Sequence, residues 1–136
     1  MKYLLYLTLL MISTSALSKE KPYSIDTYLP QINLNEFYNQ DKIRPKNSDF
    51  KINSTLAMST DEGNRAVLIN ISNLSSGRRI LEPEQIMVLY ANGQAHLLTA
   101  LPKKIILDGY QAVNLTLELG HNIYPVISVL TTNNIQ

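Results

Sequence analysis

The chain has 136 residues, of which 12 are Lys or Arg and 11 are Asp or Glu, so its formal net charge is +1. This length leaves room for one domain, and the balanced charge provides no basic stripe of the kind that nucleic-acid binding requires. The chain contains no cysteine, which excludes a disulfide scaffold, a thiolate metal site and a cysteine nucleophile.

Residues 1–18, MKYLLYLTLLMISTSALS, have the three parts of a secretory signal peptide. Lys2 supplies a positive charge, an apolar run follows, and Ala16-Leu17-Ser18 matches a small-x-small cleavage site. The alternative is a membrane anchor, but the apolar run is far shorter than the roughly 20 residues of a spanning helix. We therefore expect cleavage after Ser18 and a periplasmic or secreted protein with no membrane span. The lack of disulfides favours a bacterial exported protein.

Residues 19–49 form an N-terminal arm that is rich in proline, amide and charged residues. The arm either packs along its own domain or adds to the sheet or groove of a partner. Its aromatic side chains are too many for a purely flexible linker, which favours an arm that is partly ordered on its own domain. These aromatic residues are Tyr23, Tyr28, Phe37 and Tyr38.

From residue 50 to residue 136 the apolar residues alternate with a period of two, which is typical of half-buried strands. Turn sequences separate the strands, and Asp108-Gly109 is typical of a hairpin turn. The pattern predicts an all-β, antiparallel immunoglobulin-like β-sandwich of about seven strands, with a small β-barrel as the alternative. The predicted inward-facing residues are Phe50, Ile52, Leu56 and Met58; Val67, Ile69 and Ile71; and Val113, Leu115, Leu117 and Leu119.

Residues 84–99 contain Asn92-Gly93 between two apolar runs, which predicts a hairpin with a two-residue type I′ turn. In that register Tyr90 lies opposite Ala95, and Val88 lies opposite Leu97. The other face of the hairpin is then apolar as well, and such a face is covered by the arm or by a partner protein unless the hairpin crosses between sheets.

This second face is the predicted interaction surface, together with the aromatic residues of the arm. Its residues are Met87, Leu89, His96, Leu98, Tyr23, Tyr28, Phe37 and Tyr38.

No catalytic or cofactor-binding motif is recognisable. The chain has two histidines, His96 and His121, which we interpret as surface residues. A copper or zinc site that uses both of them, with Met58 or Met87 as a soft ligand, is the alternative. No phosphate-binding glycine loop, serine elbow or zinc-peptidase helix is present, so the sequence predicts that the protein is not an enzyme.

The run LPKKIILDGYQAVNLTLEL, residues 101–119, resembles the strand pattern of the immunoglobulin domains of periplasmic pilus chaperones. The resemblance covers about twenty residues and implies an immunoglobulin-like fold. Those chaperones have two such domains and this chain has room for one, so no residue role is carried over.

The functional hypothesis is an exported, non-catalytic protein-interaction module of the bacterial cell envelope. It would be an accessory or assembly factor of a secretion, conjugation or pilus-type complex, with a protein partner in the envelope. The tyrosine content of the chain supports this hypothesis, since tyrosine offers a large amphipathic contact area. The alternatives are a periplasmic carrier of a small ligand or of copper, and a secreted hydrolase inhibitor.

Overall fold

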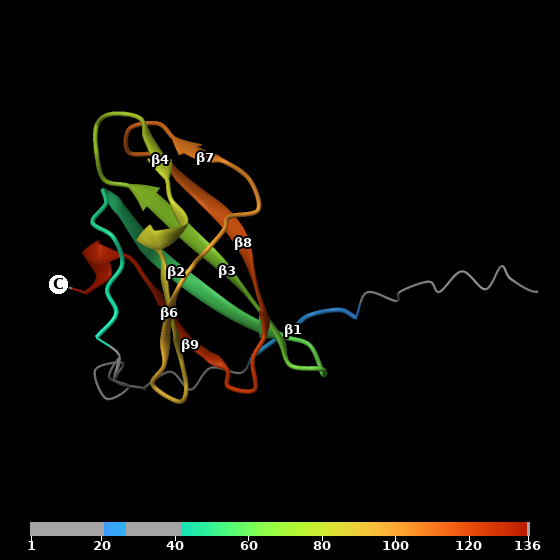
Figure 1. Ribbon diagram of the computed structural model, residues 1–136. Helices are drawn as coiled ribbons and strands as arrows, with labels where there is room; N and C mark the ends of the chain where they lie inside the picture. The colour runs from blue at the N-terminus through green and yellow to red at the C-terminus, as the bar shows by residue number, and fades with distance from the viewer. Residues whose placement is uncertain (1–20, 27–41, 136) are drawn as a thin grey trace, which may run out of the picture.

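The structure, a computed structural model, describes residues 21–26 and 42–135 (Figure 1). The predicted signal peptide and three aromatic residues of the arm, Tyr28, Phe37 and Tyr38, lie outside the described residues.

The described residues form antiparallel strands and two short 3-10 helices, which confirms the predicted all-β class. The strands are β1 (Ser24–Ile25), β2 (Phe50–Ser59), β3 (Asn64–Asn73), β4 (Arg79–Leu81), β5 (Met87–Tyr90), β6 (Ala95–Leu97), β7 (Ile105–Leu107), β8 (Ala112–His121) and β9 (Val126–Leu130), and the helices are η3 (Pro83–Gln85) and η4 (Thr132–Asn134). The strands make three sheets, ordered β1-β2-β3-β8, β6-β5-β9 and β4-β7, and none of them closes into a barrel.

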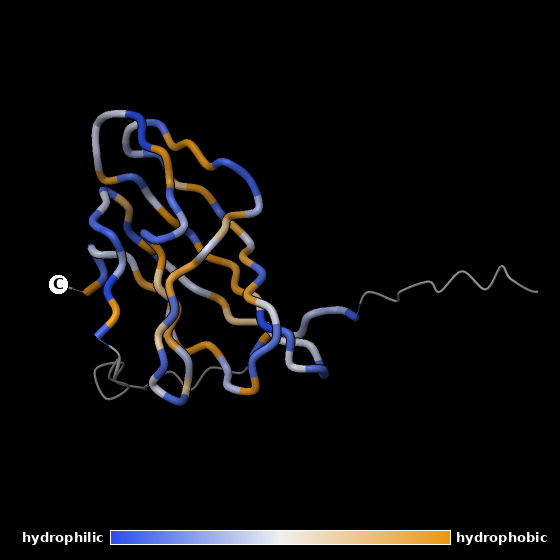
Figure 2. The backbone as a smooth tube through the Cα atoms, viewed as in Figure 1, coloured by the Kyte–Doolittle hydropathy of each residue, from blue (hydrophilic) through white to orange (hydrophobic). Residues whose placement is uncertain are grey.

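The core lies between the four-stranded sheet and the three-stranded sheet, and the β4-β7 ribbon covers one end of it (Figure 1). On β3 the predicted residues Val67, Ile69 and Ile71 are completely buried in this core. On β8 the predicted inward face is also confirmed, because Leu117 is buried and Val113, Leu115 and Leu119 pack against the core. The apolar segments in Figure 2 follow these strands.

The prediction for β2 is correct only up to a bulge. Ile52 pairs with Ile71, whereas Ser54 pairs with Asn70, so Asn53 is an extra residue. A bulge of one residue moves all following side chains to the opposite face. Leu56 is therefore 38 % exposed on the outer face, and Met58 follows it there. The prediction that Leu56 and Met58 share the core face was wrong.

The predicted turn of the β5–β6 hairpin was also wrong by one residue. Leu89, not Tyr90, pairs with Ala95. The Gly93 N–H donates to the Tyr90 carbonyl at 2.9 Å, and only Gly93 in this loop has a positive φ, of 83°. This is a three-residue loop that ends with glycine in the left-handed region, the second common hairpin type.

The Asp108-Gly109 pair does not form a hairpin, because β7 pairs with β4 and β8 pairs with β3. It makes a corner where the chain passes between sheets. The positive φ at this corner, 59°, belongs to the exposed Tyr110 and not to Gly109. Gly109 is needed for space, since a Cβ there would lie 2.0 Å from the carbonyl oxygen of Ser76.

The amide of Asn73, which is 1 % exposed, joins the loops at this end of the molecule. Its Nδ2 donates to the carbonyls of Gly77 and Asp108 at 2.8 and 3.0 Å, and its Oδ1 accepts from the Ser75 N–H at 2.9 Å. A buried polar side chain is stable only when its hydrogen bonds are made. Asn73 therefore fixes the end of β3 against the corner that precedes β8.

We predict that Gly109→Ala destabilises the protein by about 3 kcal/mol, because the added methyl group overlaps backbone atoms that cannot rotate away. The measurement is the free energy of unfolding from denaturant titration. Gly120→Ala is the matched control: φ at Gly120 is 75°, but the space around it is open, so only the conformational cost of about 1–2 kcal/mol applies. An equal loss in both variants would contradict the close approach at Ser76.

Candidate interaction surface

The structure separates the residues of the predicted hairpin surface. Met87 and Leu89 are buried on the outer side of the three-stranded sheet, in a small cluster of their own. His96 lies on the other side, because it pairs with Val88 of the main core. Leu98 also packs against the main core. The one-residue change of register is the reason, since it exchanges the faces of β6 relative to β5.

The last part of the arm covers Met87 and Leu89. Ile43 packs on them, and so do residues of β6, β9 and the C-terminal segment, namely Leu97, Leu130 and Ile135. The N–H of Lys46 donates to the Glu84 carbonyl at 2.8 Å, which holds this segment against η3. Residues 42–49 thus pack along their own domain, as the sequence favoured for the arm.

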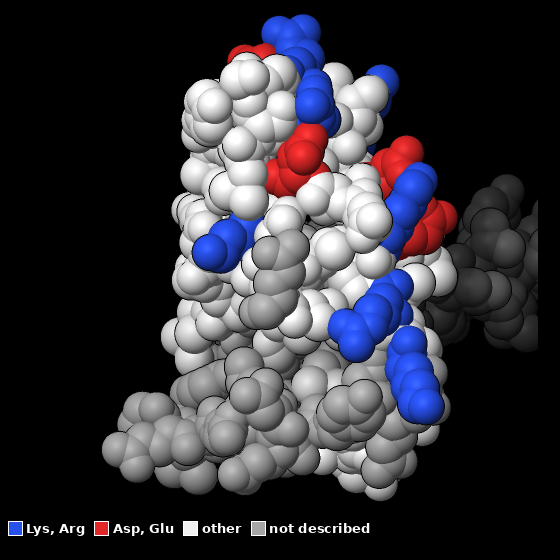
Figure 3. Space-filling model, turned by 90° about the vertical axis from the view of Figure 1, so that its left-hand side faces the viewer, with Lys and Arg blue, Asp and Glu red and all other residues white. Residues whose placement is uncertain are grey.

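The surface of this segment carries charges of both signs, and Figure 3 shows Lys and Arg side chains next to Asp and Glu. Lys46 forms an ion pair with Glu82, and this contact, together with the Coulomb attraction, raises the pKa of Lys46. Arg79 Nε lies 2.6 Å from Asp49 Oδ2. Both pairs are exposed, so their contribution to stability is small. These ion pairs leave neither a positive nor a negative electrostatic patch on this face.

His96 and Tyr90 form an edge-to-face ring pair with centroids 5.5 Å apart. Tyr90 is buried, and desolvation raises the pKa of its hydroxyl, whereas the His96 side chain is exposed. In the described residues, no three side chains among His, Asp and Glu lie close enough together to hold a metal ion. Met87 lies on the opposite side of the sheet from His96, so these two predicted metal ligands do not converge.

The N-terminal strand β1 is held against β2 by a half-buried polar group. Ile25 pairs with Met58, and the Asp26 carboxylate accepts a hydrogen bond from Ser59 Oγ. Arg65 Nη1 lies 3.9 Å from Asp26 Oδ2, and the same guanidinium donates to the Asn122 carbonyl at 2.9 Å. The predicted interaction residue Tyr23, which is 39 % exposed, directly precedes this strand.

The outer face of the four-stranded sheet carries two rows of side chains that the sequence analysis did not identify. The first, which we call the apolar row, crosses β1, β2 and β3. Leu56 pairs directly with Leu68, and Ile25 pairs with Met58. Leu68 is 37 % exposed and Ile25 is 64 % exposed, so a partner could bury apolar surface here. The apolar row comprises Ile25, Leu56, Met58 and Leu68.

The second row is a chain of three amides, which we call the asparagine row. Asn53 Nδ2 donates to Asn70 Oδ1 at 2.7 Å, and Asn70 Nδ2 donates to Asn114 Oδ1 at 2.7 Å. Since each amide has a donor and an acceptor, the hydrogen bonds run in one direction across β2, β3 and β8. The row ends at the amide of Asn114, on the last strand of the sheet.

The apolar row was hidden by the bulge at Asn53. With the predicted parity Leu56 belongs to the core, and its outward pairing with Leu68 is invisible. A sequence signal for the asparagine row did exist, because Asn53, Asn70 and Asn114 all take outward positions in the predicted alternation.

We compared the chain with protein-family models, curated proteins and solved structures, and it matches none of them. No helix among the described residues is long and apolar enough to cross a membrane.

We predict that Ile43→Ser destabilises the protein by about 1–2 kcal/mol, because it removes apolar burial over Met87 and Leu89. The readout is the free energy of unfolding. Lys42→Ser, at an exposed neighbouring position, should change it by less than about 0.5 kcal/mol. If the two variants were equally stable, the end of the arm would not pack on this face in solution.

Proposed function

We propose that this chain is an exported, non-catalytic protein-interaction module of the bacterial cell envelope, an accessory or assembly factor of a secretion, conjugation or pilus-type complex. The observation that carries the proposal is the apolar row on the outer face of the four-stranded sheet. Three of its side chains are at least 37 % exposed, and they come from three adjacent strands. A rigid sheet that presents such a row offers a preformed site for a protein partner.

The row also has the mixed character of protein interfaces. Its apolar side chains lie beside the asparagine row, whose amides give hydrogen-bonding groups at the rim of the same face. Interfaces combine an apolar centre with a polar rim in this way. Asn53 and Asn70 each donate a hydrogen bond to the next amide of the row, so the three amides are already oriented before a partner binds.

An immunoglobulin-like arrangement is part of this proposal. Two antiparallel sheets with a common core and a short ribbon at one end are typical of that architecture. Domains of this kind bind partners through sheet faces, edges and loops, and they need no catalytic group for this.

The proposal predicts that Leu56→Lys together with Leu68→Lys abolishes capture of a partner from an envelope extract. Both side chains point to solvent, so the free energy of unfolding should change by less than about 1 kcal/mol. Loss of two apolar contacts at the centre of an interface should weaken binding by at least tenfold. The measurement is quantitative cross-linking and pull-down with the purified protein as bait.

Ile106→Lys is the control, because Ile106 is 46 % exposed on the β4-β7 ribbon, outside the proposed site. A bait that lacks residues 19–41 also loses Ile25 of the apolar row, so it measures the contribution of β1 and the arm together, while Ile43 stays in place. Equal capture by the double variant and the control would refute the apolar row as the site. A native mass spectrum with a bound small ligand or copper and no protein partner would favour the carrier. Export is tested separately. The expected result is that the protein is found in the periplasm and that its first residue there is Lys19.

A further inference from the structure

The two edges of the four-stranded sheet differ in how their backbone groups are used. On the β2 edge, the Asp26 N–H donates to the Ala57 carbonyl at 3.0 Å. Further along, the Asn134 amide accepts from the Ile52 N–H at 3.0 Å and donates to its carbonyl at 2.8 Å. Thr131 Oγ1 donates to the Phe50 carbonyl at 2.7 Å. Much of this edge is therefore covered by the chain itself.

The β8 edge is open. β8 is the last strand of its sheet, and no described residue forms a backbone hydrogen bond to its far side. The Asn73 N–H donates to the Gln111 carbonyl at 2.9 Å, and hydrogen-bonded pairs alternate along an antiparallel ladder. Val113, Leu115 and Leu117 thus bond to β3. The N–H and C=O groups that point outward belong to Ala112, Asn114, Thr116 and Glu118.

This open edge lacks two of the usual protections against pairing, a lysine or proline and a short length. Natural edge strands carry lysine or proline, or they are very short. β8 has ten residues and contains neither lysine nor proline. Its bulge lies near one end, where Arg65 pairs with Gly120 and Ala66 with Glu118.

The asparagine row indicates which chemical group an added strand would place opposite the edge. Asn114 Oδ1 is used by Asn70, whereas its Nδ2 has no described partner. This amide lies on the last strand, so its free donor is available to a group on an added strand. An acceptor directly opposite Asn114 would continue the row across the edge.

We propose that β8 pairs with β8 of a second copy of this chain, antiparallel and with Thr116 on the two-fold axis. In this register Asn114 lies opposite Glu118 of the second copy, so the free amide donor meets a carboxylate on both sides of the axis. Thr116, Asn114 and Glu118 exchange backbone hydrogen bonds with their counterparts. No two like charges face each other, because Glu118 is the only Asp, Glu, Lys or Arg in β8.

A groove beside the edge suits the same register. It has a volume of about 380 Å³ and lies between β8 and the loop after β6. On the inner face of the pair, Leu115 of the second copy lies opposite Leu117, next to this groove. The groove lining is largely apolar and includes Leu98, Leu101, Pro102 and Leu117.

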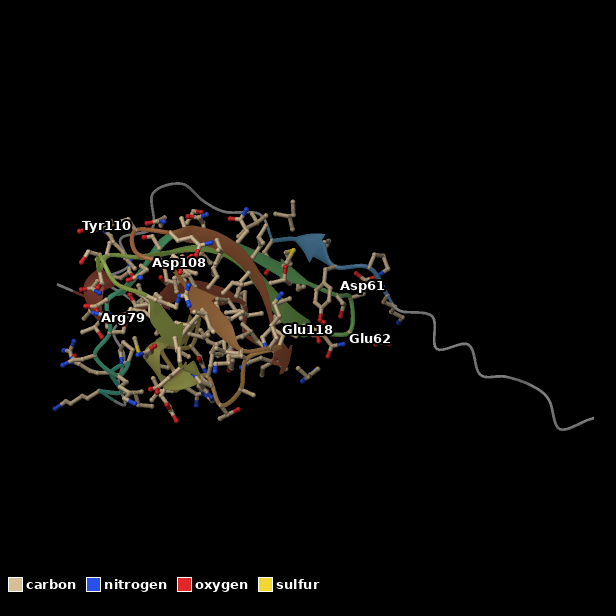
Figure 4. The ribbon with its side chains drawn as sticks, turned by 90° about the horizontal axis from the view of Figure 1, so that it is seen from above. Asp61, Glu62, Arg79, Asp108, Tyr110 and Glu118 are labelled. Carbon is tan, nitrogen blue, oxygen red and sulfur yellow. The ribbon has the colours of Figure 1, made fainter. Side chains whose placement is uncertain are left out.

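The ends of the molecule are also compatible with the antiparallel direction. Figure 4 shows Glu118 together with Asp61 and Glu62 at one end, and Asp108 and Tyr110 at the other. Antiparallel pairing keeps Glu118 of one copy apart from Glu118 of the other. A parallel pair would place the two Glu118 carboxylates side by side.

The inference goes beyond the proposed function, because contact between copies is measured without any envelope partner. The test is sedimentation velocity of the purified protein over a wide concentration range. The expected result is a dimer for the native chain and for Thr116→Val, and a monomer for Thr116→Pro. Proline removes the N–H on the axis, which has no backbone partner among the described residues, so the monomer should keep its fold.

A charge exchange tests the register and does not depend on the proline variant. Asn114→Glu places two carboxylates opposite each other on both sides of the axis and should weaken the dimer by about tenfold. Adding Glu118→Lys to Asn114→Glu should restore the affinity. A native chain that stays monomeric at its highest soluble concentration would overturn the proposal. The proposal would also be overturned if Thr116→Pro were folded by circular dichroism and still dimeric. It would be overturned as well if Glu118→Lys did not restore the dimer affinity that Asn114→Glu had weakened.

Discussion

The structure depends on β3, the strand that is paired along both edges and completely buried on one face. Val67, Ile69 and Ile71 are 0 % exposed, and each such side chain contributes roughly 1.5–3 kcal/mol by leaving water. β2 and β8, which are also ten residues long, take their positions from this strand. The three-stranded sheet packs on the face that these strands form. The apolar row, the asparagine row and the β8 edge therefore all lie on one sheet that β3 supports.

Asparagine side chains replace backbone groups at several points where strands end. Asn73 binds backbone groups of two loops, and Asn134 binds both backbone polar groups of Ile52. A primary amide has the same donor and acceptor as a peptide group, so it can complete a ladder where no strand is present. In a chain without disulfides, these amides are what fixes loops and an edge to the sheets.

The alternation of apolar residues was sufficient to predict the all-β class and the inward faces of β3 and most of β8, because these faces are set by burial alone. It failed after Asn53, since a bulge is a backbone event that leaves no mark in hydropathy. Asn92-Gly93 is compatible with both a two-residue and a three-residue loop. In the three-residue form, Met87 and Leu89 are buried by Ile43 and Ile135 from distant parts of the chain, contacts that local sequence does not reveal. The bulge also prevented prediction of the apolar row, because Leu56 faces outward only in the bulged register.

The covered β2 edge has a consequence for how the protein tolerates proteolysis. Thr131, Asn133 and Asn134 supply the hydrogen bonds that cover Phe50 and Ile52. A chain trimmed after Leu130 would keep its core strands but expose Phe50 and Ile52 on the β2 edge, in addition to the open β8 edge. One open edge limits assembly to a closed pair, whereas two unlike edges allow head-to-tail addition without end. If β8 pairs with a second copy as proposed, residues 131–134 limit that assembly to two copies, because they cover the edge to which a further copy could add.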